Sequence, residues 1–422
     1  MFEVASFSAP TGTGTTEFNV SGMGTPIACV LELSRSGAPN TGSDLAASRA
    51  FTDGTTHACM ANYYVNTSTT TFLTRYSTNR LACLLSAAGT VAGSISFHSF
   101  VADTGFGGGL KVTIDTSFPA GWIINIRFLT EGTVACGIVN TTSAPMSVPI
   151  GFQPDAVEFL GSVGVGVYND SNQNTAIFCA GMAGWDDHGV LSQGSLAWLF
   201  FWYALAAQYR QALYLSTTDV FQYLNGTVTD DAVRVTGRSS TSFSMDYGAI
   251  VSGGVYDIPY LAWKGATAKS VVVKDFQFPT STGNHGYTGL GPVEFVSVLT
   301  TQAASADSII TNFGATSVGF GDFNSTSEEA SFFGAKDASG SGSFTNGTSF
   351  GGQAAQAIEL QGIPILGASL RHAAATLTSF DSDGYTLNFS VTIGNVHFLS
   401  MSVATVATSA PGIIYRGMID AV

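Results

Sequence analysis

Charged side chains are scarce in this chain, and their scarcity excludes one large class of partner. Only 10% of the 422 residues are charged, and 15 Lys and Arg stand against 29 Asp and Glu, which gives a formal net charge of −14. Binding to a phosphate backbone depends on clustered Lys and Arg. The sequence contains no basic stripe, so we expect no nucleic-acid partner.

Cysteine is also rare, and its pattern fits neither a disulfide framework nor a metal site. The five cysteines are odd in number, lie in the first half of the chain and show no Cys-x-x-Cys spacing: Cys29, Cys59, Cys83, Cys136 and Cys179. Free cysteine commonly behaves as a small core residue. We predict five buried free thiols, which suit assembly in a reducing cytoplasm.

Long apolar runs are missing as well. The N-terminus, Met1 to Val4, lacks a basic region followed by an apolar one, so we expect no cleaved signal peptide. The longest apolar run, Leu196 to Ala207, falls well short of the roughly 20 residues that a spanning helix needs. The sequence therefore predicts no membrane span.

What the chain does contain favours strands and turns. Apolar residues make up 45% of it, Gly occurs 49 times, and Thr, Ser, Val and Phe are frequent. These residues are typical of β-strands and the turns between them. We expect an all-β protein.

The chain also matches itself at a fixed period. Strand–turn–strand segments contain Pro10, Pro145 and Pro279, which are separated by 135 and 134 residues. A second marker, an aromatic residue beside small and acidic ones, recurs with separations of 134 and 135 residues at Phe51, Trp185 and Phe320. Two markers with one period indicate three copies of a single unit.

A unit of about 135 residues with closely spaced strand signals suits one β-sandwich domain. The predicted fold is three tandem β-sandwich, jelly-roll-like repeats, at residues 1–133, 134–270 and 271–422. The second repeat carries an apolar insertion near 195–207. Periodicity alone does not separate helix from strand in that insertion.

Two acidic segments resemble metal sites but are interpreted as turns. Asp186, Asp187 and His188 could bind a divalent ion, yet the corresponding positions of the other copies, Asp53 and Asp322, lack the histidine. The segment from Asp381 to Gly384 lacks the distal Glu of a calcium loop and is typical of a hairpin turn. No signature of a nucleophile, phosphate-binding loop or zinc site occurs. We predict no catalytic, cofactor-binding or metal-binding residues, and no enzyme activity.

Three glutamates stand at the same step of the opening segments. Glu32, Glu158 and Glu294 are each flanked by apolar residues. They could converge on one axis as a threefold set of carboxylates. Strand alternation could instead turn each of them outward while its neighbours face the core.

An aromatic cluster in the middle repeat is a candidate interaction surface. It comprises Trp198, Phe200, Phe201, Trp202 and Tyr203. The alternative is burial between repeats, because an apolar patch of that size is seldom left exposed.

Three sequence segments resemble those of a known family: GFQPDAVEFL from Gly151, FPTSTGNHGYTGLGPVEFV from Phe278 and TSFDSDGYTLNF from Thr378. They are similar to tandem-repeat β-sandwich structural proteins of tailed-bacteriophage particles. The first copy departs from this pattern, with Gly22 to Pro26 in place of the Gly-Phe-x-Pro step. The resemblance implies a component of a phage particle and no catalytic residues.

These observations lead to one expected function and two alternatives. We expect a non-enzymatic virion structural protein, assembled in the host cytoplasm as a head decoration or a tail- or fibre-associated component. Its expected partners are other capsid or tail proteins. The three linked copies would form a pseudo-threefold unit, and several chains could also assemble as a homo-oligomer. One alternative is an adsorption module that binds host-surface glycans. A polysaccharide-degrading enzyme would need paired acids in a cleft, for which the sequence offers no recurring pair.

Overall fold

The computed structural model describes residues 2–406 apart from several short stretches. The exceptions are residues 36–44, 65–71, 87–89, 106, 142–144, 162–171, 174–175, 204–207, 226–227, 251–255, 302–305, 308, 313–314, 337–347, 355, 363–369, 393 and 395. The described residues form β-strands, turns and loops without a helix, and the strands pair in several antiparallel sheets. The all-β prediction is confirmed. Among these residues no helical segment has the length and apolar character needed to cross a membrane.

The first ten strands form one large sheet and one four-stranded sheet, and we call them the first set. The large sheet has the order β1-β10-β3-β4-β5-β6, and the small sheet has the order β2-β9-β8-β7. The strands are β1 (Phe2–Ser8), β2 (Gly14–Asn19), β3 (Ala28–Arg35), β4 (Leu45–Thr52), β5 (His57–Tyr64), β6 (Phe72–Ser77), β7 (Ala82–Leu85), β8 (Val91–Val101), β9 (Gly109–Thr116) and β10 (Trp122–Leu129).

The second set repeats this arrangement. Its large sheet has the order β11-β21-β13-β15-β16-β17, and its small sheet has the order β12-β20-β19-β18. The strands are β11 (Thr133–Asn140), β12 (Met146–Pro149), β13 (Ala156–Gly161), β15 (Ala176–Trp185), β16 (Leu191–Tyr203), β17 (Gln208–Ser216), β18 (Phe221–Asn225), β19 (Val228–Arg238), β20 (Ser242–Ile250) and β21 (Asp257–Lys264).

The third set has the same strand order again. Its large sheet runs β22-β32-β24-β26-β27-β28 and its small sheet β23-β31-β30-β29. The strands are β22 (Lys269–Gln277), β23 (Gly283–Thr288), β24 (Val293–Thr301), β26 (Ala315–Asn324), β27 (Glu328–Lys336), β28 (Thr348–Ala354), β29 (Ile358–Gly362), β30 (Leu370–Asp381), β31 (Gly384–Val391) and β32 (His397–Thr405).

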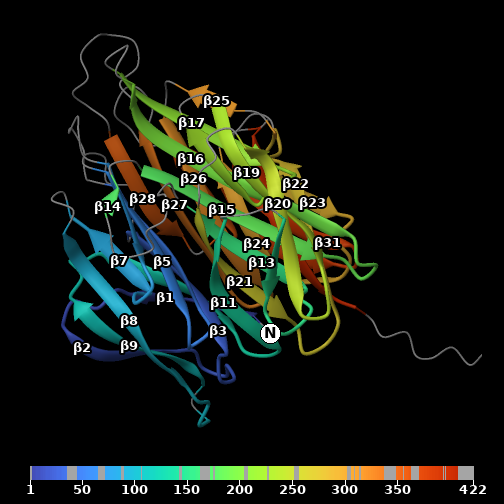
Figure 1. The fold of residues 1–422 in the computed structure, drawn as a ribbon, viewed down its shortest axis with the longest axis horizontal. Helices are drawn as coiled ribbons and strands as arrows, with labels where there is room; N and C mark the ends of the chain where they lie inside the picture. Colours follow the sequence, from blue (N-terminus) through green and yellow to red (C-terminus); the bar gives the residue numbers. More distant parts are fainter. Residues whose placement is uncertain are drawn as a thin grey trace, which may run out of the picture.

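Two short strands leave their own set and extend the sheet before it. β14 (Asn172–Gln173) belongs to the middle stretch of the chain but pairs with β6, and β25 (Ile309–Asn312) belongs to the last stretch but pairs with β17. Figure 1 shows β25 beside β17 at the top, and the blue strands of the first set at the lower left. Each large sheet of the first two sets therefore receives backbone hydrogen bonds from the next stretch of the chain.

Each set encloses an apolar core between its two sheets, so the packing is β-sandwich-like. The three cores join Leu31 of β3 to Ile95 of β8, Phe159 of β13 to Phe243 of β20, and Val298 of β24 to Leu387 of β31. The alternation of β31 shows how the sequence produces this packing. Tyr385, Leu387 and Phe389 are buried while the residues between them are more exposed, as the period of two in a strand requires.

The apolar run predicted as an insertion in the middle stretch forms a strand, which takes the same place in its sheet as β5 and β27 take in theirs. Residues from Leu191 to Tyr203 form β16, which pairs with β15 on one side and with β17 on the other. Residues 204–207 lie outside the described part. Large aromatic and aliphatic residues suit a strand that has neighbours on both sides, which resolves the question that periodicity left open.

Candidate functional site

The large sheets of the three sets contact one another in a cycle. β11 packs on β5 of the first set, β22 packs on β15 and β16 of the second, and β1 packs on β26 and β27 of the third. Each set thus places its first strand against the large sheet of another set. A fourth apolar core, shared by all three sets, fills the centre of this cycle.

Phe2 shows how closely the three sets meet. Its ring stacks on Phe295 of the third set with ring centroids 4.2 Å apart, and meets the edge of Trp263 of the second set at 5.1 Å. Phe178 and Phe320 form a similar edge contact at 5.2 Å between the second and third sets. Aromatic burial of this kind contributes strongly to core and interface energetics.

Equivalent hairpin turns lie beside the first strands of the three sets, which are β1, β11 and β22. In the turns after β4, β15 and β26, the side-chain oxygens of Asp53, Asp186 and Asn324 accept backbone N–H bonds from within the turn. These are Asx turns, in which the side chain replaces a backbone acceptor.

The same hairpins also bond to the strand that packs beside them. The backbone N–H of Cys136 in β11 donates to Asp53 at 2.9 Å, and Asn324 donates its amide N–H to the backbone oxygen of Phe2 in β1 at 3.0 Å. In the second set the corresponding bond comes from Asp187, the residue after Asp186. Its backbone N–H donates to the hydroxyl of Ser270 in β22 at 3.2 Å.

Five buried charged residues from all three sets meet within the central core. We call them the junction cluster: Glu32 of β3, Arg49 of β4, Arg127 of β10, Glu158 of β13 and Asp322 of β26. All five lie on strands of the large sheets, and the rings of Phe320 and Phe295 in the central core lie against Arg49 and Arg127. A buried charge is stable only when it is paired and hydrogen-bonded, so their mutual geometry decides what the cluster does.

Arg127 is the best-paired member of the junction cluster. One of its terminal nitrogens donates to both carboxylate oxygens of Glu158 at 2.6 Å, and the other donates to Asp322 at 3.2 Å. Its side chain is 0% exposed. Burial opposes its charge, but Asp322 and Glu158 more than offset this and raise the pKa of Arg127. One guanidinium of the first set therefore binds carboxylates of the second and third sets.

Arg49 and Glu32 are paired less closely. Arg49 Nε lies 3.4 Å from Glu32 Oε1, and its terminal nitrogen lies 3.5 Å from Glu158. The guanidinium also lies 4.6 Å from the ring centroid of Phe320 in the third set, within the range of a cation–π contact. The Ser331 hydroxyl donates to the other oxygen of Glu32 at 2.6 Å.

The junction cluster holds three carboxyl groups against two guanidinium groups. Burial, reinforced by the negative charge of Asp322, raises the pKa of Glu32 to about 7, although Arg49 and the Ser331 hydroxyl act in the opposite direction. Glu32 is thus the carboxyl group of the cluster whose pKa its burial raises towards neutral pH.

Two of the three predicted glutamates converge, and the third does not. Glu32 and Glu158 both contact Arg49 in the junction cluster. Glu294 lies outside it and pairs at 2.5 Å with Lys269, which comes from the first strand of its own set. A threefold carboxylate set is therefore absent from these positions, and alternation turns only Glu294 outward.

The matching of Asp322 with Asp53 and Asp186 as turn residues is wrong. Asn324, two residues later, makes the turn, and Asp322 lies inside β26, where it faces the junction cluster. Arg49 and Arg127 were also missed as cluster members. The only signal for them is a basic residue inside an otherwise apolar strand, as in Ile126-Arg127-Phe128.

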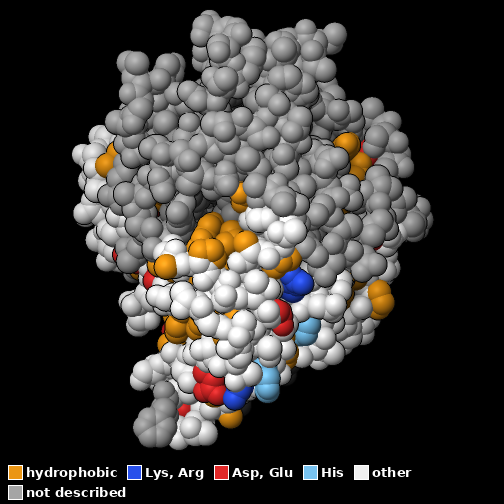
Figure 2. All heavy atoms as spheres, turned by 90° about the vertical axis from the view of Figure 1, so that its left-hand side faces the viewer, with side chains coloured by type: hydrophobic (Ala, Val, Ile, Leu, Met, Phe, Trp, Pro, Cys, Tyr) orange, Lys and Arg blue, Asp and Glu red, His pale blue; other side chains and the backbone are white. Residues whose placement is uncertain are grey.

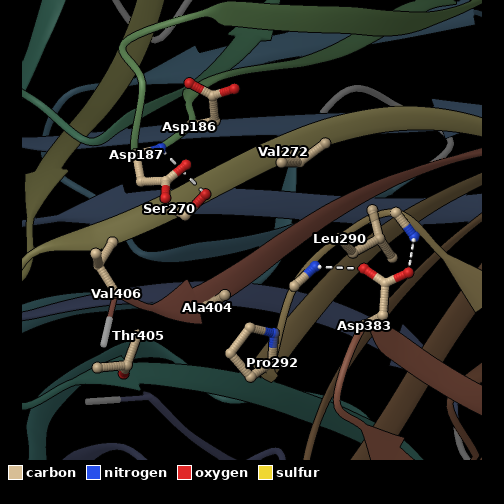
Figure 3. Close-up of a pocket in the computed structure, with 12 residues that line it drawn as sticks. Asp186, Asp187, Ser270, Val272, Leu290, Pro292, Asp383, Ala404, Thr405 and Val406 are labelled. Carbon is tan, nitrogen blue, oxygen red and sulfur yellow. Dashed lines mark hydrogen bonds between the residues drawn. The ribbon is translucent and has the colours of Figure 1, made fainter. Parts of the chain in front are cut away.

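The acidic turn in the second set borders a groove of about 540 Å³. Figure 3 shows Asp187 on one side and Asp383 on the other, with Ser270 and Pro292 between them. Asp187 Oδ1 lies 2.8 Å from His188 Nδ1, and these two side chains are well exposed. Asp383 accepts the backbone N–H groups of the loop at residues 289–291. The carboxylate of Asp383 thus caps a loop, as that of Asp186 does in its own turn, and the carboxylate of Asp187 pairs with His188.

Asp186, Asp187 and His188 bring ligand-type atoms within 4.8 Å of one another, and among the described residues no other such group of three comes together. The Asp-Gly segment behaves as a hairpin, since β30 ends at Asp381 and β31 begins at Gly384. All five cysteines are buried free thiols.

Within the predicted aromatic surface, Trp198 is fully buried in the central core. Its ring is therefore not available to a ligand on the surface of this chain. The side chains of Phe200, Phe201, Trp202 and Tyr203 lie outside the described residues, and their role stays a prediction.

The described surface offers few charges and few large apolar side chains. On the face shown in Figure 2, blue and red side chains are sparse and scattered. Among described residues the one large hydrophobic side chain that is well exposed is Val190, at 60%. A scan of protein-family models finds no match to the chain, and a search of curated proteins finds none either.

Proposed function

We propose that the chain consists of three tandem β-sandwich repeats arranged as a pseudo-threefold unit. The observation that carries this proposal is the coincidence of strand order and contacts. All three sets have the same order in both sheets, and the first strand of each packs against the large sheet of another. Three copies that contact each other heterologously in a closed cycle are related as the subunits of a cyclic trimer are.

We further propose that this unit is a non-enzymatic structural protein of a tailed-phage particle, either a head decoration or a tail- or fibre-associated component. A closed pseudo-trimer presents three related surfaces to a partner lattice that has threefold local symmetry. The resemblance of Gly151–Leu160 and Thr378–Phe389 to phage tandem-repeat proteins supports this use. The junction cluster and the shared central core support a unit that acts as one body.

Immunogold electron microscopy of particles made by the phage that encodes the chain tests the proposal. Antibody raised against the full chain should label intact particles, and cryo-EM of the labelled region should show density with pseudo-threefold symmetry. Labelling of the head supports decoration, and labelling of the tail supports a tail or fibre role. Particles without label and without the chain in their protein content would contradict the proposal.

A glycan array with the full chain addresses the adsorption alternative. Trp202→Ala is the informative variant, since Trp198 is buried and its loss would disturb the core. Binding to host glycans that disappears in Trp202→Ala would favour adsorption over a purely structural role.

A further inference from the structure

The junction cluster contains one carboxyl group that no guanidinium matches well. Both terminal nitrogens of Arg127 donate to carboxylates, one to Glu158 and the other to Asp322. Arg49 approaches Glu32 at 3.4 Å without a hydrogen bond between Arg49 Nε and Glu32 Oε1. Glu32 is therefore the member whose ionisation is least compensated.

The groups that face Glu32 come from every strand packed around it. They are Arg49 on β4, Arg127 on β10, Glu158 on β13, Asp322 on β26 and Ser331 on β27. On β10 the residue paired with Glu32 is the neutral Asn125, and β28 contains no ionisable residue in its sequence. β7 packs on the opposite face of β3, where Leu31 and Leu33 join the first core. The surroundings of Glu32 thus hold at least as much negative as positive charge.

Glu32 also lies at the seam where the cycle of sets has no covalent connection. Short turns at residues 130–132 and 265–268 join the first set to the second and the second to the third. The first and third sets meet through side-chain and backbone contacts alone, which include Ser331 with Glu32, Asn324 with Phe2, and Phe2 with Phe295. A charge at this seam acts on the contact between the first and third sets, which can separate without a direct chain connection between them being stretched.

We propose that Glu32 makes this seam sensitive to pH: the carboxyl group holds a proton in acidic solution, and the loss of this proton as the pH rises towards neutral loosens the contact between the first and third sets. The device is independent of where on a particle the protein is used. The closed form is most stable in acidic solution, and opening between β1 and β27 becomes easier as the pH rises towards neutral.

The sign follows from linkage between proton binding and folding. Burial, then Asp322, raises the pKa of Glu32 to about 7, above its ordinary value of 4.5. A carboxyl whose pKa is raised in the closed form stabilises that form fully below its ordinary value, and the stabilisation disappears as the pH rises through about 7. For one proton, the opening equilibrium increases about tenfold for each pH unit between about 4.5 and about 7, and it changes little at higher pH.

Hydrogen exchange of the full chain measures this opening directly. Peptides that cover β1 and β27 would be followed at about pH 5.5 and about pH 8, with rates corrected for the intrinsic pH dependence of exchange. We expect the corrected opening to increase by roughly 30-fold in the wild type. Glu32→Gln, which mimics the protonated carboxyl, should remove this increase. Glu17→Gln, on the exposed strand β2, is the matched control and should behave as the wild type.

Equal corrected exchange at the two pH values in the wild type, or an equal increase in Glu32→Gln, would overturn the proposal. Ser331→Ala provides a second variant if Glu32→Gln does not fold. The Ser331 hydroxyl stabilises the carboxylate and lowers the pKa of Glu32, so its removal should move the midpoint of the opening to higher pH. An unmoved midpoint in Ser331→Ala would also contradict the role of Glu32.

Discussion

Replacement of Arg127 by Met should destabilise the protein more than the loss of any single exposed charge. Arg127 is 0% exposed and holds Glu158 through two bonds of 2.6 Å and Asp322 through one of 3.2 Å. Met fills a similar volume but leaves these carboxylates buried with Arg49 as the remaining cation. Breaking a buried ion pair by removing one partner costs about 3–5 kcal/mol, and we expect a loss in this range.

Urea unfolding followed by tryptophan fluorescence measures the change, since Trp185, Trp198 and Trp263 are buried reporters in the second set. The loss should shrink as the pH falls, because protonation neutralises the stranded carboxylates. Lys111→Met is the matched control: Lys111 pairs with Glu17 at the surface, and its loss should be undetectable.

A double variant separates the ion pair from simple loss of packing. Arg127→Met combined with Glu158→Gln should lose less than the sum of the two single variants, with a coupling energy of about 1–3 kcal/mol. Strict additivity, or a loss in Arg127→Met that matches that of Lys111→Met, would refute the reasoning that the cluster joins the sets.

Three further predictions concern the central core and the thiols. Phe2→Ala should cost about 3–5 kcal/mol, because its ring contacts Trp263 and Phe295 in two other sets; urea unfolding checks it, and a loss confined to the first set would contradict it. Trp198→Ala should cost a similar amount, about 3–5 kcal/mol, since the ring is fully buried; an unchanged unfolding midpoint with altered ligand binding would instead place this ring at the surface. The five thiols should resist a disulfide reagent in the native chain and all react in guanidinium, because they are buried and burial raises the pKa of one of them, Cys179, to about 12; rapid native labelling would show that the cores open.

The strands and their rough positions could be predicted from composition, turn residues and alternation. The apolar insertion shows the limit of such patterns, because the strand β16 is specified by its pairing with β15 and β17 rather than by its own periodicity. A short apolar run is compatible with either a helix or a strand until its pairing partners are known.

The junction cluster was only partly predictable, for a related reason. Glu32 and Glu158 were candidates because they recur, yet recurrence also selected Glu294, which pairs with Lys269 instead. The repeat pattern places Asp322 in a turn. In the structure Asp322 lies inside β26, two residues before the turn, and its carboxylate lies in the core. Which face of a strand meets another set depends on the packing of sets far apart in the sequence, and this information is absent from a local pattern.

The contact of β1 with β26 and β27 has a consequence for synthesis of the chain. The inner face of β1, with Phe2 and Val4, is made before the strands β26 and β27 that pack on it, and these strands are complete only at Lys336. At about 5–20 residues per second, that face waits roughly 15–65 seconds for its cover. During this interval the apolar face of β1 lacks the cover that β26 and β27 provide in the complete chain.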